Sequence, residues 1–174
     1  MIVGESNYTD NLEREEPHAY FTHKLIEDII KGSWKHKFFS NIQRAFVEEA
    51  KPDELRKQFW HSVAHHEYIQ DWLPEPGVPP SKEMWKKGKP IFQEVVTELQ
   101  PKCILFVCKR VYDEVARDFS QSSPSLTFDE GSRKTLQIQD ARATYILHPT
   151  RNGFRKSRGV VRELIQVSGG KTWV

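Results

Sequence analysis

Two short polar stretches of the sequence contain residue types that catalysis uses. Gly4-Glu5-Ser6-Asn7-Tyr8-Thr9 follows the apolar pair Ile2-Val3, and His148-Pro149-Thr150 follows the apolar run ATYIL. A carboxylate such as that of Glu5 can stabilise a developing cation or orient a water molecule, and an imidazole such as that of His148 can donate a hydrogen bond to a leaving group. We therefore interpret each stretch as half of one candidate site.

Predicted strands must position both stretches. The hydrophobic pattern predicts strands at 2–3, 60–64, 103–108, 135–138 and 143–147. It predicts helices at 18–31, 41–50, 82–100, 109–119 and 157–167. Residues 64–69 are expected to be irregular, and residues 73–81 and 121–131 to be loops. Strands that alternate with helices predict a three-layer α/β/α domain with a mainly parallel central sheet of about four strands. The carboxyl ends of parallel strands meet at one edge, so we expect the turns at 4–9 and 148–153 to lie together there.

Length and composition restrict the class of protein. The 174 residues fit one domain, 1–174, and 37% hydrophobic with 29% charged residues is typical of a water-soluble globular chain. We find neither a membrane-spanning run nor a secretory signal, and we expect a cytoplasmic monomer. Cys103 and Cys108 are expected to be buried free thiols on opposite sides of a strand, and two cysteines are too few for a four-cysteine metal or iron–sulfur site.

Charge is distributed unevenly along the chain. Residues 1–32 have a net charge of −4, whereas residues 131–162 have a net charge of +7. This asymmetry indicates a surface for a polyanion in the C-terminal third, with a solvated basic helix as the alternative. His61, His65 and His66 allow a metal site if they lie on one helix, but no third remote ligand is evident, so we expect neither a metal nor another cofactor.

In order along the chain, these motifs resemble those of the uracil-DNA glycosylase superfamily. The best-known branch has Gly-Gln-Asp-Pro-Tyr-His where this sequence has Gly4 to Thr9, and His-Pro-Ser-Pro-Leu-Ser where it has His148 to Gly153. Gly4, Tyr8 and His148 fit, and the pair Gly4-Glu5 matches other branches. Ser6 stands in place of the water-activating aspartate of the best-known branch, Asn152 in place of its leucine wedge, and His65, His66 or Glu67 in place of the asparagine that recognises the base.

The resemblance implies a DNA-repair hydrolase that flips uracil or another damaged base out of DNA and cleaves its N-glycosidic bond. Glu5 would act on the sugar or on water, and His148 on the base. The expected base pocket comprises Gly4, Ser6, Asn7, Tyr8 and His66. The expected DNA contacts come from the last turn and the helix behind it, namely Thr150, Arg151, Asn152, Arg155, Lys156 and Arg158. The departures from the family motifs leave open an alternative, a catalytically degenerate module that binds nucleic acid or a nucleotide without cleaving it.

Overall fold

The chain alternates strands and helices in a computed structural model that describes residues 1–8, 18–47, 54–75, 77–118, 122–128, 131–150 and 157–169. The elements in chain order are β1 (Ile2–Gly4), α1 (His18–Lys31), α2 (Lys37–Phe46), α3 (Glu54–Ser62), β2 (His65–Glu67), α4 (Lys82–Leu99), β3 (Cys103–Phe106), α5 (Lys109–Asp118), β4 (Ser122–Phe128), β5 (Gly131–Ile138), β6 (Ala141–Tyr145) and α6 (Ser157–Val167). None of the described helices is long and apolar enough to cross a lipid bilayer.

A mixed sheet in the order β2-β1-β3-β6-β5-β4 forms the middle of the molecule. The pairs β1–β2, β1–β3 and β3–β6 are parallel, whereas β5 pairs antiparallel with both β6 and β4. The predicted α/β class with a mainly parallel sheet is confirmed. The predicted strand number is too low, because the described residues form a six-stranded sheet.

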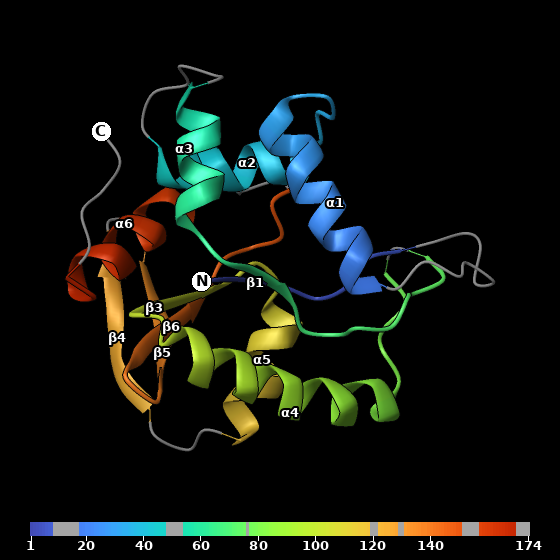
Figure 1. Cartoon of the computed structure of the whole chain (residues 1–174). Helices are drawn as coiled ribbons and strands as arrows, with labels where there is room; N and C mark the ends of the chain where they lie inside the picture. The colour runs from blue at the N-terminus through green and yellow to red at the C-terminus, as the bar shows by residue number, and fades with distance from the viewer. Residues whose placement is uncertain are drawn as a thin grey trace.

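Helices cover both faces of this sheet (Figure 1). On one face, α1, α2, α3 and α6 pack against Ile2, Leu105 and Ile146 in one apolar cluster. On the other face, α4 and α5 pack against Val3 and Phe106 in a second cluster. Neighbouring residues of β1 and β3 therefore point into different cores, which explains why the central strands are apolar without alternation.

The helix predicted at 82–100 is confirmed in detail. Ser81 adopts extended backbone dihedrals, and its hydroxyl accepts a hydrogen bond from the Met84 backbone N–H at 3.2 Å, so it is the N-cap. Gly88 is buried where α4 crosses the chain after β2. A Cβ atom at Gly88 would lie 2.4 Å from the carbonyl oxygen of Tyr68, so this close approach requires glycine.

Three secondary-structure predictions need correction. Residues 60–64 are mostly helical, because Phe59 and Trp60 are both buried against the α2 layer as part of α3, and the strand comes later as β2. The helix predicted at 41–50 begins earlier, at Lys37, and the extended residue Val47 follows its last residue, Phe46; residues 48–50 lie outside the described part. Its buried residues Phe39, Ile42 and Ala45 recur every three positions, which is the helical signal.

The loop predicted at 121–131 is also wrong over most of its length. Residues 122–128 form β4, which pairs antiparallel with β5, and the register shifts between Ser123 and Leu126. Pro124 lies within that shift on a strand at the sheet border, the position at which a residue without a backbone N–H is tolerated. The strand predicted at 135–138 belongs to β5, which lies between β6 and β4 in the sheet.

Candidate functional site

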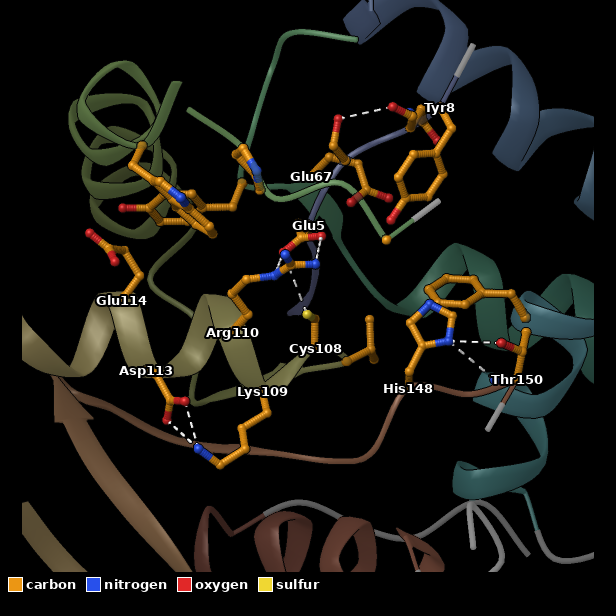
Figure 2. Close-up of a pocket in the computed structure, with 18 of the residues that line it drawn as sticks. Glu5, Tyr8, Glu67, Cys108, Lys109, Arg110, Asp113, Glu114, His148 and Thr150 are labelled. Carbon is orange, nitrogen blue, oxygen red and sulfur yellow. Dashed lines mark hydrogen bonds and ion pairs between the residues drawn. The ribbon is translucent and has the colours of Figure 1, made fainter. Parts of the chain in front are cut away.

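The carboxyl ends of β1, β3 and β6 open onto one pocket of about 1620 Å³. Glu5 and Tyr8 follow β1, Arg110 lies at the start of α5 behind β3, and His148 follows β6 (Figure 2). Because β1, β3 and β6 run parallel, their following turns emerge at the same edge. The predicted meeting of the two polar turns is confirmed for Glu5 to Tyr8 and for His148 and Thr150, while Thr9 and residues 151–153 lie outside the described residues.

Glu5 is buried and forms an ion pair with Arg110. Its Oε1 lies 2.7 Å from Arg110 Nε, and its Oε2 accepts a hydrogen bond from Arg110 Nη2 at 2.9 Å (Figure 2). Burial raises the pKa of Glu5, while the guanidinium of Arg110 and the hydrogen bonds from Arg110 and Cys108 oppose that rise. The two-point pairing holds a carboxylate in a fixed orientation at the pocket floor.

Glu67, at the end of β2, is a second buried carboxyl group in the pocket lining. Burial, and secondly the charge of Glu5, raise the pKa of Glu67 to about 8. Glu67 is therefore mostly protonated at neutral pH. Its Oε2 has no hydrogen-bond partner among the described residues.

Gly4 and His65 determine where the Glu67 side chain lies. Gly4 pairs with Glu67 across β1 and β2, and a Cβ atom on Gly4 would lie 2.1 Å from Glu67 Oε2. Glycine at position 4 therefore leaves the space that the carboxyl group occupies. His65 Nε2 lies 3.6 Å from Glu67 Oε1, and burial lowers the pKa of His65 to about 4. We interpret this as a contact between two neutral groups rather than an ion pair, because burial favours the uncharged form of each.

His148 is oriented by Thr150 and by an aromatic ring. Its Nδ1 lies 2.9 Å from the Thr150 hydroxyl and accepts a hydrogen bond from the Thr150 backbone N–H at 3.4 Å. The Phe38 ring lies 5.2 Å from the imidazole, centroid to centroid. Because Nδ1 is the acceptor, a neutral imidazole has its proton on Nε2, which makes Nε2–H a hydrogen-bond donor.

Other residues predicted for the base pocket have mainly structural contacts. The Ser6 hydroxyl donates to the Asp71 carbonyl at 2.8 Å, and the Asn7 side-chain amide donates to the Thr22 hydroxyl at 2.7 Å. These bonds fix the turn that presents Tyr8, whose pKa is raised by burial to about 12, so the phenol is neutral. Ser6, Asn7 and Tyr8 all contribute to the lining, whereas Gly4 lies behind Glu67.

The structure places two predicted residues elsewhere. His66 is not among the lining residues; its ring lies 6.2 Å from that of Phe92 on the α4 face, and Glu67 lines the pocket at the end of β2 instead. Arg158 is exposed on α6 and does not line the pocket. Of the predicted DNA contacts, only Thr150 lies in the lining; Arg151, Asn152, Arg155 and Lys156 are outside the described residues.

Glu67 was only one of three candidates predicted for its place in the pocket, and Arg110 was not predicted. Arg110 follows β3, a third parallel strand whose end had to reach the same edge, so topology offered a signal for it. The histidine spacing does not form a helical metal motif, since α3 ends at Ser62 and His65 belongs to β2. No protein-family model matches the chain, and no curated protein matches it either.

Proposed function

We propose that this protein hydrolyses the N-glycosidic bond of a uracil or other damaged base that has been flipped out of DNA. The observation that carries the proposal is the position of Glu5 and His148 in one pocket, although 143 residues separate them in the chain. Cleavage of a base–sugar bond develops positive charge on the sugar and negative charge on the departing base. A site for this reaction needs an anion near the sugar and a donor near the base.

The pocket residues fit these two requirements. The Glu5 carboxyl group, paired with the Arg110 guanidinium, supplies the anion near the sugar. The Nε2–H of His148 supplies the donor for the base, with Thr150 fixing the ring. Glu67 adds a neutral carboxyl group that can donate a hydrogen bond, and Tyr8 adds an aromatic wall. The flipped base would have to lie between Glu5 and His148 for both roles to operate.

One observation favours the second candidate, a module of the same fold that binds nucleic acid or a nucleotide without cleaving it. Both oxygens of Glu5 already contact Arg110, which reduces their capacity to orient a water molecule. A structural ion pair would leave the pocket able to hold a base and unable to activate the attacking water.

The test is base release from oligonucleotides that contain uracil, hypoxanthine or xanthine, as single strands and duplexes, followed by mass spectrometry. We expect release by the wild type and at least a ~100-fold loss in His148→Ala, since one well-placed donor contributes about 100-fold or more. Glu5→Gln removes the anion near the sugar and should also suppress release. Glu114→Gln, a lining carboxylate on α5 that pairs with Arg117, is the control for charge loss, and the exposed His23→Ala is the control for loss of an imidazole.

The outcomes separate the candidates. Release that Glu5→Gln and His148→Ala suppress, with the control variants active, supports the hydrolase. No release from any substrate, combined with DNA binding that weakens steeply as salt rises, supports the binding module. No release and no salt-dependent binding would contradict both.

A further inference from the structure

Exposed aromatic and basic residues alternate at the rim of the pocket, between α1 and α2. Residues 33–37 are Ser-Trp-Lys-His-Lys, and all five are exposed. Trp34 and His36 both line the pocket, with their ring centroids 4.9 Å apart and their planes at 33°. Trp34 is 39% exposed, which is unusual for so large an apolar side chain. We refer to residues 33–37 as the rim segment.

Hydrogen bonds fix the backbone of the rim segment. Gly32 ends α1 with a left-handed φ of 77°, and the backbone N–H groups of Ser33 and Trp34 both donate to the Asp28 carbonyl, at 3.1 and 3.3 Å. At the other end the His36 carbonyl accepts the first hydrogen bond of α2, from Ser40 N–H at 3.0 Å. Trp34 is therefore presented by a backbone bonded at both ends, so a ligand that stacks on it has little backbone ordering to impose.

Ring contacts connect the rim segment to the site. The Phe38 ring contacts His148 and, at 5.0 Å, Phe39; Phe39 in turn lies 5.9 Å from His36 and 6.4 Å from Trp34. Aromatic side chains thus connect the proposed leaving-group donor with the outer edge of the pocket, through the buried ring of Phe39. A planar ligand larger than one base, or a neighbouring base on the same strand, can contact the exposed rings of Trp34 and His36 at that edge.

The charge of the rim segment suits a polyanion. Lys35 and Lys37 are exposed, and residues 32–38 contain no acidic side chain. Flat aromatic faces beside lysines are the combination by which proteins bind single strands: bases stack on the rings and the cations contact phosphates. A duplex keeps its bases stacked inside, so the ring of Trp34 has no equivalent partner on an intact duplex.

We propose that the rim segment binds single-stranded nucleic acid, with the base next to the one in the pocket stacked on Trp34 and its phosphates near Lys35 and Lys37. The inference rests on the proposed function, because it requires that the pocket holds a base of the same strand. It specifies the substrate as a single strand, and it assigns this role to a segment outside the family-like motifs.

Fluorescence anisotropy tests the inference with a labelled single strand of about 16 nucleotides containing one uracil, the matching blunt duplex, and the same strand with abasic sites in place of all its bases. We expect the single strand to bind more tightly than the duplex. Trp34→Ala should weaken single-strand binding about tenfold, consistent with the contribution of one stacked base, and should leave abasic-strand binding unchanged. Tyr20→Ala removes another exposed aromatic, one outside the pocket lining, and should have no effect.

The double substitution Lys35→Ala/Lys37→Ala tests the phosphate contacts. A plot of log affinity against log salt has a negative slope, and the double substitution should make that slope less steep by about 1.4. Each phosphate contact of a single strand contributes about 0.7 to the steepness. Lys24→Ala/Lys57→Ala removes two exposed lysines outside the pocket lining and should leave the slope unchanged.

Binding and base release give separate readouts. Trp34-dependent single-strand binding without base release would support the inference and contradict the hydrolase. Equal affinity for duplex and single strand, or a Trp34→Ala variant that binds the single strand as the wild type does, would overturn the inference whether or not base release occurs. Trp34-dependent binding of anionic lipid vesicles without single-strand binding would overturn it too.

Discussion

The protonation state of Glu67 predicts an unusual dependence of stability on pH. Glu67 has a folded-state pKa of about 8 against an ordinary value of 4.5, so between these pH values the folded chain holds a proton that the unfolded chain has lost. Its contribution to stability is complete below pH 4.5 and is lost as the pH rises to 8. His65, with its pKa lowered from 6.5 to about 4, has the opposite effect: stability rises with pH until 6.5. The two effects oppose each other below pH 6.5, and the loss from Glu67 is unopposed by His65 above it.

The magnitude follows from the size of the shift. One pKa unit corresponds to about 1.4 kcal/mol. The titration of Glu67 therefore lowers the free energy of unfolding, relative to its value in acid, by about 2 kcal/mol at pH 6 and by about 4 kcal/mol at pH 8. Glu67→Gln keeps the shape and removes the titration. The free energy of unfolding of Glu67→Gln should therefore exceed that of the wild type by an amount that grows by about 2 kcal/mol between pH 6 and pH 8.

Urea unfolding of wild type and Glu67→Gln at a series of pH values measures this difference. Glu94→Gln is the matched control for the loss of a carboxyl group, because Glu94 is an exposed glutamate of α4. A constant difference between wild type and Glu67→Gln from pH 6 to pH 8 would refute the assignment of a buried, protonated Glu67.

Two further substitutions test the packing and the ion pair. Gly88→Ala should lower the free energy of unfolding by about 1–3 kcal/mol in urea unfolding, since its Cβ would meet the Tyr68 carbonyl at 2.4 Å; a gain of about 1 kcal/mol, as expected for an unhindered helix position, would contradict the close approach. Arg110→Met should cost about 1–2 kcal/mol, less than for a fully buried pair because Arg110 is 40% exposed. That loss should shrink as the pH falls and Glu5 becomes protonated, and a loss independent of pH would argue against the pairing.

Long elements with regular patterns were predictable from the sequence. α1 and α6 match their predicted bounds because apolar residues recur at helical spacing and clear end signals such as Gly32 follow. β3 was predictable as a central strand because the run CILFVC has no polar residue to expose. In each case the local signal and the tertiary environment favour the same structure.

The secondary-structure predictions failed where contacts with another element of the fold determine the local structure. Nothing local in residues 122–128 requires a strand, and Pro124 argues against one; β4 forms because β5 supplies hydrogen-bond partners beside it. Residues 59–69 combine two adjacent buried aromatics with three histidines, and the switch from α3 to β2 after Ser62 depends on packing between α2 and the sheet. Sequence periodicity contains no information on those partners.

In the site, too, the sequence predicts residue types, whereas the tertiary contacts determine their environment. Glu5 and His148 were predictable because each follows an apolar strand, but their chemical states depend on residues that the motifs do not include. Glu5 and Glu67 are both buried carboxyl groups in one lining, and among the residues that the structure describes only Glu5 pairs with an arginine. Burial raises the pKa of both groups, but Arg110 opposes the rise at Glu5, whereas the charge of Glu5 adds to the rise at Glu67, so two identical residues differ in their environment. Burial and the position of Arg110, which the motifs do not contain, therefore determine which chemistry each carboxyl group can perform.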